Sequence, residues 1–238
     1  MQVHHNGDLD YLRQAPESGP VKQVIVLLHG YGRDASLMKK QADAVASRLP
    51  QALILMPNAP ELLDGDVSDV GNMLRMPEQL RGDDPHGARL RRQWFSIRAA
   101  RLADMAQNLH GAAQRVNEFL SAQLAAHGLK DSDAALMGFS QGGVVALYAA
   151  YGRAQPVACV VSHSAIFMGG AGLISRPPTL YLYGLDDEEF TPQRYAEAAG
   201  HVQAHIPQVD VQAIAGLRHT TNTESRTIVA DYIAGHFK

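Results

Sequence analysis

The pentapeptide Gly138-Phe139-Ser140-Gln141-Gly142 places a serine between two glycines, after the apolar run 134–137 and before the apolar run 143–150. A serine at such a strand-to-helix turn is typical of a nucleophile elbow, in which small flanking residues permit a sharp turn that projects the hydroxyl from a sheet. The alternative is a glycine-rich turn whose serine only caps the next helix. The flanking runs favour the elbow, so Ser140 is the candidate nucleophile for acyl transfer.

A serine hydroxyl is a weak nucleophile at neutral pH, so an acid and a histidine base are expected after it, in that order. The predicted strand that ends at Gly184 is followed by four successive carboxylates: Asp186, Asp187, Glu188 and Glu189. We favour Asp187 as the acid because it lies three residues past the strand and because Phe190 can anchor the loop. Asp186 is the alternative. Glu188 and Glu189 are expected to face solvent, as runs of like charge usually do.

His219 is the candidate base because it lies between a predicted strand at 209–214 and the last predicted helix. The rival is His163, at the end of the strand that follows the elbow. The other histidines lie before the elbow or within helices. The expected order of serine, acid and histidine favours His219.

Two backbone amides are expected to bind the oxyanion that forms during acyl transfer. Gln141 follows the nucleophile and would supply one of them. The loop 29–32 follows the first buried strand and contains two glycines, which let the backbone turn close to a substrate. Tyr31 is the residue of this loop that we expect to supply the second amide.

The elements that would position these residues can also be predicted. The continuous apolar run 24–28 indicates a strand buried on both faces, as in a parallel sheet. Further strands are predicted at 52–56, 134–137, 157–161, 180–184 and 209–214. Helices are predicted at 36–49, 104–127, 143–150, 192–205 and 222–236. This alternation predicts a single α/β domain over 1–238, with a mostly parallel sheet and helices on both faces.

Residues 58–93 are predicted to form a long irregular insertion, because glycine and proline interrupt them repeatedly. Loops of this length in compact domains are usually functional, which makes a substrate-covering flap the alternative to a solvated surface loop. We assign Leu62 and Met73 to a substrate pocket. Together with neighbouring apolar residues they could build a groove for a long acyl chain, or form a contact within a homodimer.

Composition excludes several other classes of function. The formal net charge of −3 gives no basic face of the size that nucleic acid requires, despite a local cluster of Arg89, Arg91 and Arg92. The single cysteine, Cys159, cannot form an internal disulfide. No apolar signal segment or membrane span is found, so a cytoplasmic location is expected. No motif for a metal or another cofactor stands out.

Several motifs together resemble the phospholipase/carboxylesterase family of α/β-hydrolases, which includes acyl-protein thioesterases and small bacterial carboxylesterases. They are Leu28-His29-Gly30-Tyr31-Gly32, Pro57-Asn58-Ala59-Pro60, Trp94-Phe95, Gly138-Phe139-Ser140-Gln141-Gly142-Gly143, Asp187 and His219. The stretch 92–97 is most similar to the bacterial esterase branch. The resemblance implies an α/β-hydrolase fold, a triad of Ser140, Asp187 and His219, an oxyanion hole formed by the amides of Tyr31 and Gln141, and Trp94 and Phe95 at the acyl site.

The chain departs from the family pattern at two positions beside the expected triad. Tyr183-Gly184 stands where family members often have His-Gly, and Arg218-His219 stands where they often have Gly-His. The segment 58–93 is also long for the family. Neither departure removes a group that the chemistry needs.

We therefore expect a serine carboxylesterase that cleaves a small-molecule ester through an acyl-enzyme intermediate. One alternative is an acyl-protein thioesterase or lysophospholipase that acts on long acyl chains. The other is a binding protein without activity on a hydrolase fold, because fold alone does not fix function.

Overall fold

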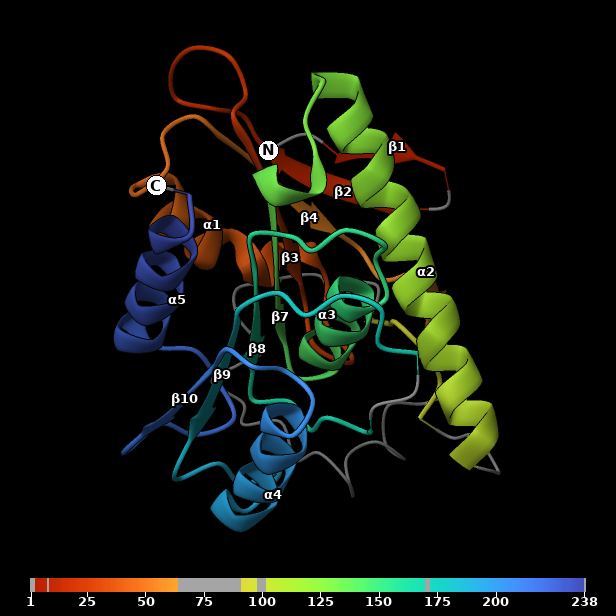
Figure 1. The fold of residues 1–238 in the computed structure, drawn as a ribbon, viewed down its shortest axis with the longest axis vertical. Helices are drawn as coiled ribbons and strands as arrows, with labels where there is room; N and C mark the ends of the chain where they lie inside the picture. The colour runs from red at the N-terminus through yellow and green to blue at the C-terminus, as the bar shows by residue number, and fades with distance from the viewer. Residues whose placement is uncertain (1–2, 8, 64–90, 98–101, 170–171, 238) are drawn as a thin grey trace.

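A computed structural model describes residues 3–7, 9–63, 91–97, 102–169 and 172–237. Its centre is an eight-stranded sheet in the order β1-β2-β4-β3-β7-β8-β9-β10 (Figure 1). The strands are β1 (Val3–Asn6), β2 (Leu9–Gln14), β3 (Gln23–Leu28), β4 (Ala52–Pro57), β7 (Ala134–Phe139), β8 (Cys159–His163), β9 (Thr179–Gly184) and β10 (Val209–Ile214). The strands from β4 to β10 in this order are parallel, whereas β2 is antiparallel to both of its neighbours.

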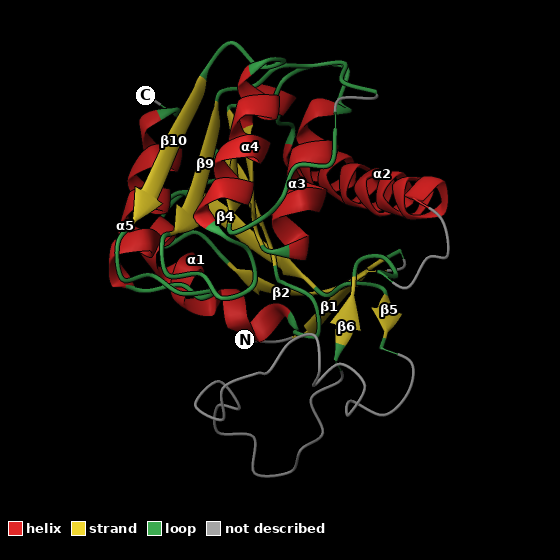
Figure 2. Ribbon diagram, turned by 90° about the horizontal axis from the view of Figure 1, so that it is seen from below, coloured by secondary structure: helices red, strands yellow, loops and turns green. Residues whose placement is uncertain are grey.

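Helices cover both faces of this sheet (Figure 2). The α-helices are α1 (Lys39–Ala46), α2 (Leu102–His127), α3 (Gln141–Tyr151), α4 (Pro192–Gln203) and α5 (Thr223–Gly235). Leu109 of α2, Leu147 of α3 and Tyr195 of α4 belong to one buried cluster. Val45 of α1 and Ile233 of α5 belong to the other. The two clusters lie on opposite faces of the sheet.

Strand β3 shows why the apolar runs of this chain form central strands. Val24 and Val26 pack into the cluster with α2 and α3, whereas Ile25 and Leu27 pack into the cluster with α1 and α5. Successive side chains of a strand point to opposite faces, so a strand covered by helices on both sides must be apolar throughout. The mostly parallel sheet and the helices on both faces confirm the predicted fold class.

Parallel strands bring their carboxyl ends to one edge of the sheet, and the candidate residues follow those ends. Ser140 comes directly after β7, Asp187 lies three residues after β9, and His219 lies in the loop after β10. The elements thus bring together side chains that are up to 79 residues apart in the sequence.

The structure differs from the sequence predictions at both ends of several elements and adds three antiparallel strand pairs. β1 and β2 form an antiparallel extension of the sheet within the polar N-terminal region, which the sequence analysis left without strands. The strand expected at 157–161 runs instead over Cys159–His163. A second, two-stranded sheet pairs β5 (Glu61–Leu62) with β6 (Arg92–Gln93). The segment 58–93, predicted to be irregular, therefore has a short strand near each end.

Most of the predicted insertion, including Met73, lies outside the described residues. Within the described ranges, no helix combines the length and the apolar character that are needed to cross a bilayer.

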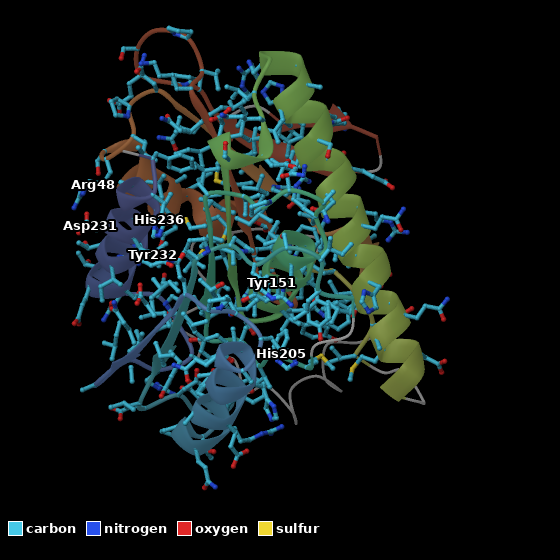
Figure 3. All side chains as sticks on the ribbon, in the orientation of Figure 1. Arg48, Tyr151, His205, Asp231, Tyr232 and His236 are labelled. Carbon is cyan, nitrogen blue, oxygen red and sulfur yellow. The ribbon has the colours of Figure 1, made fainter. Side chains whose placement is uncertain are left out.

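Two ion pairs hold helices together in contrasting surroundings. Arg153 pairs with Asp131 while also donating to the Asn117 side chain, and the side chains of Arg153 and Asp131 are only 9% and 20% exposed. Arg48 pairs with Asp231 at 2.7 Å and joins the end of α1 to α5, but these side chains are 41% and 57% exposed (Figure 3). The two pairs thus share their chemistry and differ in burial.

We expect Arg153→Ala to lower the free energy of unfolding by about 2 to 3 kcal/mol, because it leaves the Asp131 carboxylate without its partner in a largely buried setting. Arg48→Ala is the matched control and should cost less than about 1 kcal/mol, as exposed pairs do. Urea denaturation followed by the fluorescence of Trp94, the only tryptophan, measures both. Equal losses in the free energy of unfolding would contradict the expectation that the more buried pair contributes more to stability.

Candidate active site

Ser140 has the backbone conformation that a nucleophile elbow requires. Its φ of 52° and ψ of −121° lie in a region that residues other than glycine rarely occupy. Its amide donates to the carbonyl oxygen of His163 at 2.8 Å, which ties the turn to the end of β8. Strain of this kind costs about 1–3 kcal/mol and is concentrated at functional sites.

The glycines around Ser140 are required by the packing of α3 against β7. A Cβ on Gly138 would lie 2.0 Å from the carbonyl oxygen of Gly142, and a Cβ on Gly142 would lie 2.4 Å from that of His29. A Cβ on Gly143 would lie 2.8 Å from the Cβ of Ala165. Glycine at all three positions lets the helix start directly against the sheet, which is what forces the sharp turn at Ser140.

Three side chains form a continuous hydrogen-bonded row at this turn. Nε2 of His219 lies 3.0 Å from Oγ of Ser140, and Nδ1 of His219 lies 2.8 Å from Oδ2 of Asp187. The imidazole also lies between two aromatic rings, with centroid distances of 5.0 Å to Phe139 and 6.2 Å to Phe190. The structure thus brings together the predicted nucleophile, base and acid in hydrogen-bonding order.

Asp187, rather than Asp186, is the carboxylate in contact with His219. Its Oδ1 accepts from the amides of Glu189 and Phe190 at 2.9 and 3.2 Å, and it is 8% exposed. Burial acts to raise its pKa, but hydrogen bonds from His219 and its other donors outweigh burial and hold the pKa below the usual value. Asp186 is exposed, and the geometry therefore favours Asp187.

His163, the rival base, is fully buried at the end of β8. Its Nδ1 lies 3.0 Å from the hydroxyl of Ser164 and not beside Ser140. Burial lowers the pKa of its imidazole to about 3, with a further lowering by the charge of His219. His163 is therefore neutral under ordinary conditions and makes no contact that a base for Ser140 needs.

The loop after β3, which carries Tyr31, lies against the elbow. A Cβ on Gly30 would be 3.3 Å from the Cβ of Ser140. The indole N–H of Trp94 donates to the carbonyl oxygen of His29 at 2.8 Å, which holds the start of this loop. Gln141 begins α3, where the first backbone amides have no partner within the helix. The loop that carries Tyr31 thus lies close to Ser140, and the amide of Gln141 directly follows Ser140 in the chain.

The side chain of Gln141 fastens the neighbouring segment to the elbow. It accepts from the amide of Trp94 at 2.9 Å and donates to the carbonyl oxygen of Phe95 at 2.7 Å. Trp94 and Phe95 are 1% and 3% exposed and belong to the core. This burial favours a role in supporting the site over direct contact with substrate. Leu62, by contrast, is 48% exposed on β5.

Sequence reasoning missed two residues that hold the triad. Glu188 is exposed as expected, but its carboxylate accepts from the amide of His219 at 3.1 Å and from Arg218 at 2.7 Å. Arg218, beside His219, is thus paired with Glu188, beside Asp187. Their opposite charges next to the two predicted site residues were the sequence signal for this pair. Tyr195, in α4, donates to Asp187 at 2.7 Å, and no pattern in the sequence marked it.

No group of three or more His, Cys, Asp or Glu side chains within the described ranges is arranged to hold a metal ion. The side chains that do lie together among the described residues are the Ser140 hydroxyl, the His219 imidazole and the Asp187 carboxylate.

Comparison with known proteins places this arrangement in a family. Residues 80–237 match the model of the phospholipase/carboxylesterase family. The chain belongs to this family. The matched region contains Ser140, Asp187 and His219, and the proteins of the family are hydrolases.

Solved structures have the same fold. The esterase PE8 is 22% identical with a TM-score of 0.76, and the alignment covers 94% of this chain and 97% of that one. The carboxylesterase of Bacillus cereus is 17% identical with a TM-score of 0.72, over 98% and 96% of the two chains. Acyl-protein thioesterase 2 of Zea mays is 18% identical with a TM-score of 0.68, over 96% and 99%. This member of the phospholipase/carboxylesterase family therefore has the α/β-hydrolase fold.

The environment of His29, a buried histidine directly after β3, favours the neutral form of its imidazole. His29 is buried, with Nδ1–H donating to the Gly30 carbonyl at 2.8 Å and Nε2 accepting from the Ala59 amide at 3.0 Å. Burial outweighs the bond to Gly30 and lowers the pKa of His29 to about 4, from 6.5. Between these values the unfolded chain binds a proton that the folded chain does not.

We therefore expect the free energy of unfolding to fall as the pH drops from 6.5 to 4, by up to about 3 kcal/mol from His29 alone. His163 should act in the same direction, because burial lowers its pKa to about 3. Asp187, with its lowered pKa, loses its contribution only at still lower pH. Urea unfolding at several pH values measures this. A free energy of unfolding that stays constant from pH 7 to 4.5 would contradict the neutral state of His29.

Proposed function

We propose that this protein is a serine esterase that hydrolyses carboxylic esters through an acyl-enzyme intermediate on Ser140. The observation that carries the proposal is a pair of hydrogen bonds made by His219. Its Nε2 lies 3.0 Å from Oγ of Ser140, and its Nδ1 lies 2.8 Å from Oδ2 of Asp187. The strained conformation of Ser140 supports it, because a turn that served only to cap a helix would not need this strain.

In the first half of the reaction, Oγ of Ser140 attacks the carbonyl carbon of the ester while its proton passes to Nε2 of His219. The carbonyl oxygen becomes an oxyanion, which the amides of Tyr31 and Gln141 bind. His219 then gives its proton to the departing alcohol, the ester bond breaks, and the acyl group stays on Ser140. In the second half, water attacks the acyl carbon with His219 as base, and the acid is released as the proton returns to Ser140.

Asp187 has two roles in this scheme. Its Oδ2 accepts from Nδ1 of His219, which leaves the lone pair of Nε2 directed at Ser140. It also stabilises the imidazolium that forms when His219 takes the serine proton, and it stays ionised throughout. The lowered pKa of Asp187 supports this role, since it keeps the carboxylate ionised at neutral pH.

Two classes of ester are candidate substrates. We propose a small-molecule carboxylic ester, because similar structures include an esterase and a carboxylesterase. A thioester with a long acyl chain is the second candidate, favoured by the similarity to an acyl-protein thioesterase. Comparing kcat/KM for 4-nitrophenyl esters of increasing acyl length separates the two: a maximum at short chains supports the first and a maximum at long chains the second. A cytoplasmic location remains a prediction of the sequence.

We expect Ser140→Ala to lower kcat by about 10⁶, as removal of the nucleophile does in other triads. The rate of 4-nitrophenyl ester hydrolysis measures the loss. The control is a melting curve, which should match that of the wild type because alanine at 140 removes only the hydroxyl. Retention of more than a tenth of the activity would exclude Ser140 as the nucleophile and would leave the proposal without support.

Asp187→Asn should lower kcat by about 10⁴, because an amide no longer fixes the orientation and the charge of His219. Asp186→Asn is the matched control. It makes the same chemical change one residue away on an exposed side chain, and it should leave kcat within a few-fold of the wild type. Steady-state kinetics of both variants on the same ester test the assignment of Asp187 as the acid. A large loss of kcat in Asp186→Asn but not in Asp187→Asn would contradict it.

A further inference from the structure

Tyr195 reaches the acid of the triad from a different element of the fold. It lies in the first turn of α4 and is fully buried. Its hydroxyl donates to Oδ2 of Asp187 at 2.7 Å, and this is the same oxygen that accepts from His219 at 2.8 Å. Since Oδ1 already accepts from two backbone amides, the carboxylate has a donor for each lone pair.

A second hydroxyl and an imidazole extend this contact away from the site. The side chain of Ser164 lies beside the hydroxyl of Tyr195, where it acts to lower the pKa of Tyr195, and Nδ1 of His163 lies 3.0 Å from the Ser164 oxygen. The directions of these bonds follow from Asp187, which can only accept when it is ionised. Tyr195 must donate to it, which leaves its oxygen to accept from the Ser164 side chain beside it, and Nδ1–H of His163 can then donate to Ser164.

This order of bonds agrees with the state of His163. A neutral imidazole with its proton on Nδ1 leaves Nε2 as an acceptor, and Nε2 has no partner among the described residues. Burial lowers the pKa of His163 to about 3, so its charge does not change while the site works. At neutral pH the hydroxyl of Tyr195 therefore donates in one direction, toward Asp187.

Tyr195 and Ser164 are held in fixed positions by their surroundings. The ring of Tyr195 is stacked on that of Tyr183, with centroids 4.7 Å apart and planes 15° from parallel, and its edge packs against Phe190 at 5.8 Å. Tyr183 is one of the two positions at which the sequence departs from the family pattern. Ser164 has a φ of 51°, in the left-handed region, and its amide donates to Leu182 at 2.8 Å. A strained residue that is not glycine indicates a functional constraint.

We propose that Tyr195, supported by Ser164 and His163, is a positioning residue that holds Oδ2 of Asp187 and limits the negative charge that this oxygen presents to His219. The inference rests on the proposed function of the triad. A hydrogen bond from Tyr195 draws charge away from Oδ2, so His219 retains a proton less strongly than it would beside a carboxylate without this donor. The activity of the enzyme should therefore extend to a lower pH with this donor than without it.

Other charged groups near His219 stay the same when Tyr195 is changed. Among the described residues, these are Glu188 and Glu189 in the acid loop and Arg218 beside the base, while His163 at the end of β8 is neutral. A difference between variants in the pH dependence of activity therefore reports the contact of Tyr195 with Asp187.

The test is the pH profile of kcat/KM for a 4-nitrophenyl ester in Tyr195→Phe, which removes the hydroxyl and keeps the stacked ring. We expect kcat to fall by about tenfold, as loss of a hydrogen bond to a charged group does, with KM within about twofold. The acid limb of the profile should move up by about half a pH unit, because His219 holds its proton more strongly. A purely structural role would not move this limb.

The matched control is Tyr151→Phe. Tyr151, labelled in Figure 3, is also fully buried. Its hydroxyl bonds to Thr179 at 3.0 Å, at the start of β9, whereas Asp187 follows the end of that strand. It should lose stability to a similar extent, measured by urea unfolding, without a shift of the acid limb. Ser164→Ala leaves the bond between Tyr195 and Asp187 in place and should shift the acid limb in the same direction by a smaller amount. It replaces Tyr195→Phe as the test variant if that variant does not fold.

The outcomes separate the two proposals. If wild-type activity depends on Ser140, but neither Tyr195→Phe nor Ser164→Ala moves the acid limb, the role of Tyr195 is wrong and the proposed function stands. The same conclusion follows if Tyr151→Phe moves the limb as far as Tyr195→Phe does. If wild-type hydrolysis is absent or persists in Ser140→Ala, the proposed function itself fails.

Discussion

The close contact between β7 and α3 is the constraint on which the site depends. The contact exists because Gly138, Gly142 and Gly143 have no side chains, and a Cβ at Gly138 would lie 2.0 Å from a backbone oxygen. With the helix starting this close to the sheet, the chain can turn only through the strained conformation of Ser140, at φ 52°. The packing of the core thus determines where the hydroxyl points, and the loops after the other strands are arranged around that point.

The second organising feature is the full set of hydrogen bonds around one buried carboxylate. Asp187 accepts from two backbone amides, from His219 and from Tyr195, so its charge is stabilised by hydrogen bonds as well as by the neighbouring base. A buried charge without such donors would be neutralised by a proton. Glu188 adds a bond to the amide of His219. The loop that carries Asp187 and Glu188 therefore holds both the imidazole and the backbone of His219.

The sequence alone predicted the parts of this arrangement that depend on local pattern. The apolar run of β3 and the glycines around Ser140 each have a direct physical reason, burial on both faces and close packing, that shows in the residue types. It did not predict the antiparallel strands β1 and β2, because short strands with one exposed face lack a continuous apolar run. It also missed Tyr195, because the helix that carries it meets Asp187 only after the chain has folded.

Reaction with a fluorophosphonate tests the central claim, that Ser140 is the activated nucleophile, most directly and without knowledge of the natural substrate. The serine oxygen would attack phosphorus and displace fluoride, so intact mass and peptide mapping locate the adduct. We expect one adduct per folded chain, on Ser140, and none in Ser140→Ala. A folded wild-type chain that stays unlabelled, or one that carries its adduct on another residue, would contradict it.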